Sequence, residues 1–180
     1  TQQWKQLKNS VDTPVCTGED IYSLDGFKPL IDNDAVSIIH PDLATSGGIL
    51  ETKRIGDYAQ EKGIPMALHQ AGSPVVAMAN VHCAAATEGF IALEMHSVDN
   101  PWWDDLVNAE TDKIINNGFV KVPESPGLGV TLNEDAVEKH LNTNASGFAG
   151  KGKSMDIYPT GAFEPTDEWD KLDSHDRTWS

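Results

Sequence analysis

VSIIHPDLATSGGILETKRIGDYAQEKGIPMALH, residues 36–69, is the stretch that decides the fold of this chain. It opens with a β-branched apolar run that stops at Asp42, continues through a segment of helical length, and closes with a second apolar run that stops at His69. An apolar strand, a helical crossover and another apolar strand form a right-handed parallel unit. The stretch therefore predicts two neighbouring parallel strands that carry Asp42 and His69 at their carboxyl ends.

The same rhythm continues on both sides of this unit. The run PVCTGE ends at Glu19 and the run FIALE ends at Glu94, so that four apolar runs stop at polar residues at nearly even intervals. Repeated alternation of strand and helix predicts an α/β fold with a parallel sheet. Such sheets carry their active sites at the carboxyl ends of their strands. We therefore expect one edge of the sheet to gather Glu19, Asp42, His69 and Glu94.

Helices are expected between the strands, over residues 22–31, 49–63 and 74–89. The last of them begins with Pro74, which a helix tolerates at its first position. This helix is apolar nearly all round, which predicts burial on both sides. Because it is apolar and is followed by Trp102 and Trp103, the sequence also suggests a subunit contact and hence a homo-oligomer.

The alternation stops at Pro101, and the rest of the chain has a different character. A strand is expected over residues 118–123 and a helix over residues 133–141. From Asn142 the chain is rich in Gly, Asn and Ser, and then in acidic and aromatic residues. This composition predicts an extension that follows the strand-and-helix part.

Composition limits the classes of partner. The chain has 180 residues, which predicts one domain, and 39% of them are hydrophobic, enough for a packed core. Its formal net charge of −15 predicts repulsion from phosphate backbones, so we expect no nucleic-acid partner. An anionic small molecule would need a bound cation to offset this charge. No apolar stretch reaches the roughly 18 residues of a membrane span, so no membrane partner is expected.

The two cysteines and the first residues bear on the setting of the protein. Cys16 and Cys83 both lie inside apolar runs, which predicts buried thiols in a reducing compartment. No signal-peptide pattern is present, so a cytoplasmic location is expected. The chain opens with TQQWKQLKNS, which is typical of the last turns of a helix and suggests a fragment of a longer protein.

The four strand-end residues suit acid and base chemistry. Histidine titrates near neutrality, so His69 can take a proton beside a carbonyl group or give one to a leaving hydroxide. Asp42, one strand away, can hold the other ring nitrogen and raise the pKa of the ring. Glu19 offers the hard oxygen that Mg²⁺ prefers. Glu94 can hydrogen-bond a developing enolate oxygen across the mouth of the site, which is the space at the carboxyl edge of the sheet.

Each of these residues also has a plain structural interpretation. An isolated Asp or Glu after a strand is commonly a helix N-cap or a solvated loop residue, and only the register of all four favours a site. We assign His40 a structural role in the barrel interior, and His82 the role of a satisfied core histidine. No pattern marks the remaining histidines, which are His96, His140 and His175.

From about Thr13 to Leu132 the chain resembles the C-terminal half of the mandelate racemase and muconate lactonizing enzyme branch of the enolase superfamily. The motifs that carry the resemblance are TGE, PDLATSGG, IPMALH, ALE and PESPGLGV. The first four contain the strand-end residues, in the same order. HPD, GSP and SPGLG look most like the acid-sugar dehydratases of this branch.

The resemblance implies the C-terminal half of a modified (β/α)₇β TIM-like barrel plus a C-terminal extension. Residues 1–108 would form a barrel half with four βα-type units, and residues 109–180 a strand, loop, helix and tail. It implies a Mg²⁺ ion that holds the carboxylate of a small anionic sugar acid, with Glu19 as a metal ligand. His69 with Asp42 would act as acid or base, Glu94 would contact the substrate, and the product would be a 2-keto-3-deoxy acid.

The departures from the family pattern imply half an active site. An N-terminal capping domain, a lysine pair on the second strand and two further metal carboxylates have no counterpart in this sequence. Half a barrel also leaves open edge strands. We expect a missing N-terminal half or a second chain. Two other functions stay open: a cycloisomerase, racemase or lactonizing enzyme with the same enediolate chemistry, and a non-catalytic fragment or assembly module.

Overall fold

The computed structural model of the chain describes residues 1–97 and 100–140. Contacts divide the chain into two units, Thr1–Glu134 and Asp135–Ser180. Helix α6 (Glu134–Lys139) begins at the boundary, inside the helix predicted over residues 133–141. The extension predicted from Asn142 onward lies outside the described residues, and the division predicted at residue 108 stays a prediction. Within the described ranges, no helix has both the length and the apolar character to cross a membrane.

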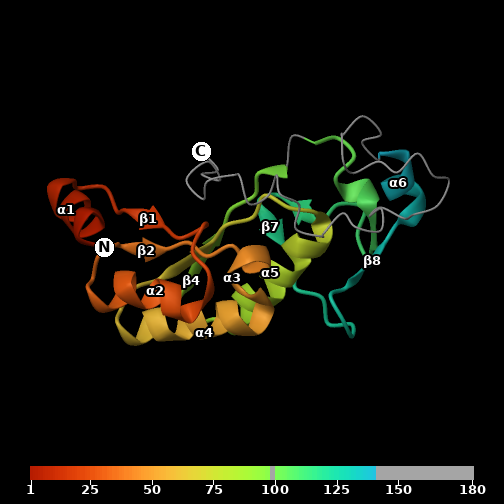
Figure 1. The fold of residues 1–180 in the computed structure, drawn as a ribbon. Helices are drawn as coiled ribbons and strands as arrows, with labels where there is room; N and C mark the ends of the chain where they lie inside the picture. The colour runs from red at the N-terminus through yellow and green to blue at the C-terminus, as the bar shows by residue number, and fades with distance from the viewer. Residues whose placement is uncertain (98–99, 141–180) are drawn as a thin grey trace, which may run out of the picture. The chain divides into compact units, whose positions relative to one another are not determined.

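A four-stranded parallel sheet is the centre of the first unit. Its strands are β1 (Cys16–Thr17), β2 (Ile38–Ile39), β3 (Met66–Leu68) and β4 (Phe90–Leu93), and they pair in sequence order (Figure 1). All three pairings are parallel. Parallel strands that follow one another around a sheet, each reached by a helical crossover, form part of a barrel wall. The predicted fold class is confirmed, for the part of the barrel that this chain contains.

The first two strands are shorter than the apolar runs that predicted them. The regular pairing of β1 and β2 covers two residues each, because the backbone before it is paired irregularly. The carbonyl of Val15 accepts hydrogen bonds from two successive backbone N–H groups, those of Ser37 and Ile38. The hydroxyl of Ser37 in turn accepts the N–H of Val15, in place of a backbone carbonyl.

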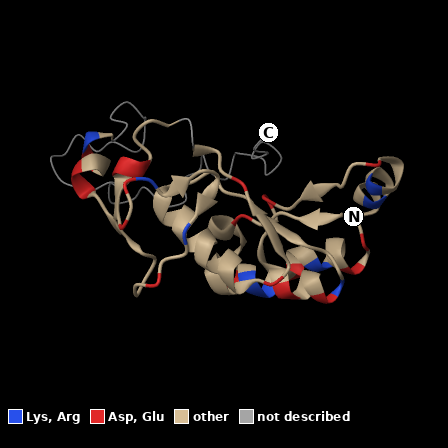
Figure 2. Cartoon of the chain, turned by 180° about the vertical axis from the view of Figure 1, so that it is seen from behind, with Lys and Arg blue, Asp and Glu red and all other residues tan. Residues whose placement is uncertain are grey.

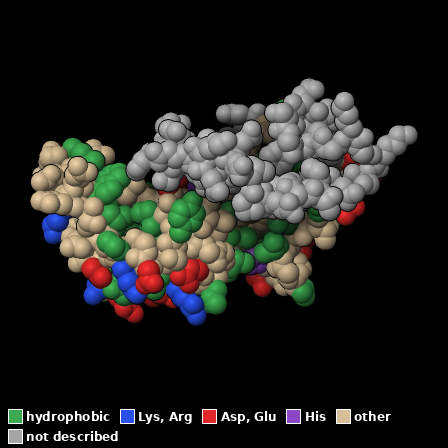
Figure 3. Space-filling view, viewed as in Figure 1, with side chains coloured by type: hydrophobic (Ala, Val, Ile, Leu, Met, Phe, Trp, Pro, Cys, Tyr) green, Lys and Arg blue, Asp and Glu red, His purple; other side chains and the backbone are tan. Residues whose placement is uncertain are grey.

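Helices α2 (Ser23–Asp32), α4 (Gly48–Glu61) and α5 (Pro74–Ala86) cross over between the strands and cover one face of the sheet (Figure 1). The four-residue helix α3 (Leu43–Ser46) precedes α4. All three long helices were predicted, to within three residues at each end. Acidic and basic residues alternate along α2 and α4 in the cartoon (Figure 2), and acidic and basic side chains gather along the lower left margin of the space-filling view (Figure 3).

The main core lies between the sheet and helices α2 and α4. Phe27, Ile39, Ile55, Met66 and Leu68 are all fully buried in it. They come from two helices and two strands, so each crossover places its apolar side chains on the same layer. This packing sets the position of each strand along its own axis. It therefore also sets where the strand-end residues lie at the carboxyl edge of the sheet.

A second core covers the far side of α5. Ala77, Met78 and Val81 of this helix pack with Trp103, which is 5% exposed, and with Val107. The prediction that α5 is buried on both sides is confirmed. Trp103 is an internal core residue, so the suggested subunit contact through this residue is wrong. His82 of the same helix is not fully satisfied, because its Nε2 has no hydrogen-bond partner among the described residues.

The segment after β4 forms two small antiparallel pairs. A 3₁₀ turn (Asp104–Leu106) leads into β5 (Val107–Ala109), which pairs with β8 (Val130–Leu132). Strands β6 (Ile115–Asn116) and β7 (Phe119–Val120) form a hairpin. The single strand predicted over residues 118–123 is therefore one arm of this hairpin, and the sequence analysis missed the other arm.

Both outer strands of the parallel sheet lack a neighbour among the described residues. Cys16 on β1 is exposed and Cys83 is buried, and both are free thiols, so the prediction of burial fails for Cys16. At the other edge, beside β4, a groove of about 480 Å³ is lined by residues that include Ile91 and Phe119. Ile91 is 54% exposed and Phe119 is 78% exposed.

The opening segment forms α1 (Gln2–Ser10), as predicted, and none of its residues is buried. Its lysines tie it to the turn after α2. Lys8 forms an ion pair with Asp34, and Lys5 donates to the carbonyl of Asn33 at 2.8 Å. The helix is therefore attached by polar contacts at its surface rather than by a core.

Candidate functional site at the carboxyl edge of the sheet

The backbone register places the predicted residues at one edge. Asp42 and His69 form an isolated parallel bridge just beyond β2 and β3. The N–H of His69 donates to the carbonyl of Pro41 at 3.1 Å, and the N–H of Glu94 donates to that of Leu68 at 2.8 Å. Three strand-end residues therefore stand side by side, as the alternation predicted.

The imidazole of His69 is held by the carboxylate of Asp42. The Nδ1 atom of His69 lies 2.6 Å from Oδ2 of Asp42, and the two side chains are 14% and 13% exposed. The other carboxylate oxygen, Oδ1, accepts the N–H of Ala44 at 2.7 Å and caps α3. The cap and the dyad are thus one group, although the sequence analysis treated them as alternatives. With Nδ1 occupied, Nε2 of His69 is left to face the mouth.

Glu19 and Glu94 lie on the Nε2 side of His69. Oε2 of Glu19 is 3.3 Å from Nε2, and Oε2 of Glu94 is 3.8 Å from it. Glu19 is brought there by a tight turn at Gly18, whose φ of 141° favours glycine. A Cβ at that position would lie 2.6 Å from Cε1 of Phe27. The structure therefore brings all four predicted side chains to one mouth, while their chemical roles stay predictions.

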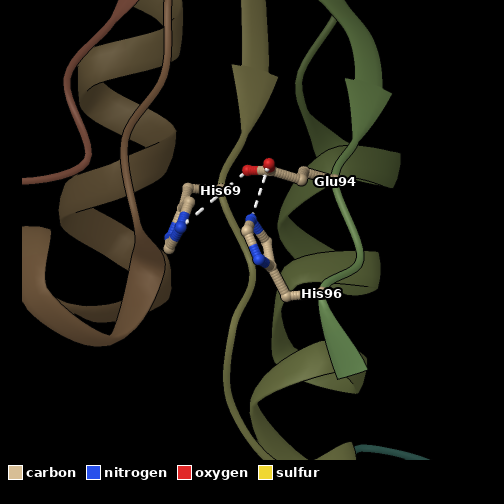
Figure 4. A group of neighbouring side chains, drawn as sticks. All are labelled: His69, Glu94 and His96. Atoms are coloured by element: carbon tan, nitrogen blue, oxygen red, sulfur yellow. Dashed lines mark hydrogen bonds and ion pairs between the residues drawn. The ribbon is translucent and has the colours of Figure 1, made fainter. Parts of the chain in front are cut away.

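Two histidines that were not predicted to be site residues, His40 and His96, complete the cluster. Nε2 of His40 lies 2.8 Å from Oε2 of Glu94, and Nδ1 of His40 lies 3.3 Å from the carbonyl of Ala67. Nε2 of His96 lies 2.7 Å from Oε1 of Glu94 (Figure 4). Each carboxylate oxygen of Glu94 therefore lies within hydrogen-bonding distance of one imidazole nitrogen. His40 does lie in the interior as predicted, but it belongs to the site.

A signal for both histidines was present in the sequence. His40 precedes Asp42 by two residues, and His96 follows Glu94 by two. In extended chain, residues two apart point to the same side. The period-two spacing next to each strand-end acid was therefore the pattern to follow.

The charge of Glu94 follows from these contacts. Burial raises the pKa of its carboxyl group, but the hydrogen bonds and charges of His40 and His96 outweigh burial and lower the pKa below its ordinary value. Glu94 is therefore ionised at neutral pH and accepts hydrogen bonds. The predicted bond from Glu94 to an enolate oxygen would need the protonated form, which these neighbours disfavour.

The donor atoms of the mouth suit a divalent cation. One ligand atom from each of Glu19, His40 and Glu94 lies within 4.8 Å of the others. Carboxylate oxygens are the ligands that hard cations such as Mg²⁺ take. The pair of carboxylates in this group therefore fits a divalent metal, and Glu19 is the more accessible of the two, with its side chain 52% exposed.

The chain is similar to known proteins over about three quarters of its length. The model of the family described as enolase C-terminal domain-like matches residues 1–136. D-xylonate dehydratase of Haloferax volcanii is 45% identical over 137 residues, which are 76% of this chain and 33% of that protein. D-gluconate/D-galactonate dehydratase of Picrophilus torridus is 35% identical over 133 residues, 74% of this chain and 34% of that protein.

Solved structures give the same picture. A mandelate racemase/muconate lactonizing enzyme-like protein from Rubrobacter xylanophilus superimposes with a TM-score of 0.74 and 38% identity, over 76% of this chain and 35% of that one. The 3,6-anhydro-D-galactonate cycloisomerase from Zobellia galactanivorans gives 0.70 and 32%, over 78% and 39%.

The chain spans about a third of the length of the curated relatives it matches. Residues 1–136, which the family model matches, include the parallel strands and the mouth described above. The resemblance drawn from the sequence motifs is confirmed, for the C-terminal half of the fold. The chain belongs to the enolase C-terminal domain-like family, in its mandelate racemase and muconate lactonizing enzyme branch.

Proposed function

We propose that this chain supplies part of the active site of a hydro-lyase that dehydrates sugar acids. The observation that carries the proposal is the fixed imidazole of His69, with Asp42 on Nδ1 and two carboxylates facing Nε2. Relatives whose names state D-xylonate and D-gluconate/D-galactonate dehydratase support the substrate class. The reaction would remove the proton beside the carboxylate and the 3-hydroxyl group, and would yield a 2-keto-3-deoxy acid.

His69 would move a proton in this reaction. In its neutral form the ring donates Nδ1–H to Asp42 and keeps a lone pair on Nε2, which can accept the proton beside the substrate carboxylate. In its protonated form Nε2–H can instead protonate the departing 3-hydroxyl, which leaves as water. Asp42 orients the ring in both forms and stabilises its positive charge. Ionised Glu94 would accept a hydrogen bond from a substrate hydroxyl.

Glu19 would be a ligand of a magnesium ion in this proposal. When bound, the ion supplies positive charge opposite the substrate carboxylate and so favours loss of the adjacent proton. Mg²⁺ takes about six oxygen ligands, several of them water, and the described residues offer the carboxylates of Glu19 and Glu94. We propose that further ligands and the second base come from residues other than those described, in the missing half or in a second chain.

The test is proton NMR in deuterated water with a panel of sugar acids and Mg²⁺. Dehydration leaves an enol that takes its new C3 hydrogen from solvent, so we expect a 2-keto-3-deoxy product with one deuterium at C3. His69→Asn should abolish turnover with the fold retained, whereas His82→Asn, at a histidine on α5, should not. Retained turnover in His69→Asn would overturn the assignment.

A cycloisomerase is the second candidate, because a solved cycloisomerase shares the fold at a TM-score of 0.70. The same enediolate can be reprotonated or can open a ring without loss of water. In the NMR experiment an isomer of unchanged composition would then replace the keto-deoxy acid. A third candidate, a non-catalytic assembly module, predicts that His69→Asn leaves every biological activity intact.

The proposal of a missing half has its own test. Intact mass spectrometry and size-exclusion chromatography of the purified active protein would show whether it contains more than this chain. We expect a mass well above that of the chain or a second bound polypeptide. A mass near 19.5 kDa with monomeric behaviour would contradict it.

A further inference from the structure

The mouth contains a second group of possible metal ligands besides the one that includes Glu19. His69, Glu94 and His96 each offer one ligand atom, and these atoms lie within 4.8 Å of one another. Figure 4 shows the imidazoles of His69 and His96 next to each other, each joined to the carboxylate of Glu94 by a dashed line. The ring centroids of His69 and His96 are 5.4 Å apart.

The outer contacts of this group are those of a supported metal site. Histidines that bind metals almost always give their other ring nitrogen to a carboxylate or carbonyl, which fixes the tautomer and leaves a lone pair for the ion. Asp42 does this for His69, at 2.6 Å from Nδ1. His40 holds Oε2 of Glu94 at 2.8 Å and leaves Oε1 on the side of His96. Two of the three ligands are therefore already oriented.

The chemistry of the donors selects the ion. Two imidazole nitrogens and one carboxylate oxygen bind Zn²⁺, Co²⁺ and Ni²⁺ well, whereas Mg²⁺ prefers oxygen alone. In a tetrahedral zinc site with bonds of about 2.1 Å, neighbouring ligand atoms are about 3.4 Å apart. Nε2 of His96 lies 2.7 Å from Oε1 of Glu94, which is closer than this spacing, and because its side chain is 56% exposed the ring can rotate to make room for the ion.

We propose that His69, His96 and Glu94 form a binding site for a borderline divalent cation such as Zn²⁺, distinct in its donors from the oxygen ligands offered to Mg²⁺. The two groups share Glu94, whereas Glu19 and His40 belong only to the first group and His69 and His96 only to the second. Occupancy ties up Nε2 of His69, the atom assigned to proton transfer. A consequence, which rests on the proposed function, is that zinc inhibits the dehydratase and that a zinc-selective chelator, with Mg²⁺ kept in excess, restores it.

Calorimetric titration of the metal-stripped protein with Zn²⁺ tests the site without any assay of activity. We expect His96→Ala to weaken Zn²⁺ binding at least about tenfold, the usual scale for disturbing a metal shell. The matched control is Glu88→Gln, which removes an exposed acid before β4, at the opposite end of that strand from Glu94. Equal Zn²⁺ binding in wild type and His96→Ala would overturn the proposal.

Two further measurements separate this site from its neighbour. Co²⁺ should give visible absorption typical of nitrogen ligation in the wild type, and His96→Ala should lose it; an unchanged spectrum would contradict the site. Glu19→Gln should leave Zn²⁺ affinity within about threefold. If Glu19→Gln abolishes Zn²⁺ binding and His96→Ala does not, zinc uses the oxygen ligands and the proposal fails.

Failure of the proposed function would look different. In that case Zn²⁺ binds with the expected dependence on His96, but no sugar acid is turned over with or without the chelator. Circular dichroism of His96→Ala should match the wild type, since the side chain lies more than half in solvent. A loss of binding then reports the ligand and not the fold.

Discussion

Asp42 both caps α3 and holds the imidazole of His69, and two substitutions separate these two roles. Asp42→Asn keeps an oxygen that can cap α3 but removes the charge that His69 meets, whereas Asp42→Ala removes both. We expect Asp42→Ala to lower the free energy of unfolding by about 1 kcal/mol more than Asp42→Asn, the usual value of an N-cap. Both should lose activity. Urea unfolding and turnover measure the two effects, and equal stability of the two variants would contradict the cap.

The lowered pKa of Glu94 predicts a pH-dependent contribution to stability. A carboxyl group whose pKa is lower in the folded state stabilises the fold fully above its unfolded pKa of about 4.3, and this contribution is lost as the pH falls through the folded pKa. Relative to Glu94→Gln, the wild type should therefore hold its advantage from pH 7 to about pH 5 and lose it progressively below. Urea midpoints at each pH would show this. An advantage that persists unchanged at pH 3 would disprove an origin in the ionised carboxylate.

At the residue scale, the sequence predicted the positions of the site better than its contacts. Glu19, Asp42, His69 and Glu94 follow from strand ends, because each ends an apolar run. The hydrogen bonds of two imidazoles to Glu94 could not be predicted, because they depend on how far neighbouring strands are shifted along their axes. This shift is set by packing between the sheet and the helices, which no local sequence pattern records.

Among the elements, the turn after β1 depends on the absence of a side chain at Gly18. Gly18→Ala combines an unfavourable φ of 141° with a contact of 2.6 Å to Phe27, so we expect a loss of roughly 2–4 kcal/mol of stability. Gly63→Ala is the matched control, because its φ is 74° and nothing lies near its added Cβ. It should cost only about 1 kcal/mol. Chemical denaturation of both variants gives the comparison, and equal losses would exclude the contact with Phe27.

The helices were predictable and the small strands were not. Apolar periodicity and Pro74 fixed the helices to within three residues, because a helix makes its own hydrogen bonds. The hairpin of β6 and β7 was half missed. Its turn lies at Asn117 and Gly118, which both have positive φ, and Asn-Gly between two short runs is a hairpin signal that the sequence analysis overlooked.

For the whole molecule, the edge of the sheet at β4, which has no neighbouring strand among the described residues, predicts association. An unpaired strand beside an apolar groove is a template for another strand. Ile91→Lys, at a side chain that is 54% exposed, should shift the protein toward the unassociated state and leave its secondary structure unchanged. Light scattering at several concentrations would measure the shift. If Ile91→Lys leaves the association constant as it was, association uses another surface.

The sequence predicted the order of the strands, but it did not predict which distant residues pack together in a core. Trp103 was predicted to be a contact residue because it belongs to a pair of tryptophans that follows an apolar helix, but it packs in a core with Val107 and α5. Burial of this kind joins residues that are far apart in sequence, and composition alone does not reveal the partner. The parallel sheet, in contrast, followed from four strand-and-helix units in succession, and the half-barrel followed from the resemblance that the motifs carry.

The carboxylate of Asp42 both caps the four-residue helix α3 and orients the imidazole of His69. The orientation of His69 therefore depends on whether this short helix stays folded. Short helical turns fray at temperatures far below those that melt a domain. Warming should therefore abolish turnover at temperatures at which the tertiary structure persists. Parallel heating curves of residual turnover and near-ultraviolet circular dichroism would reveal that gap, and coincident curves would deny it.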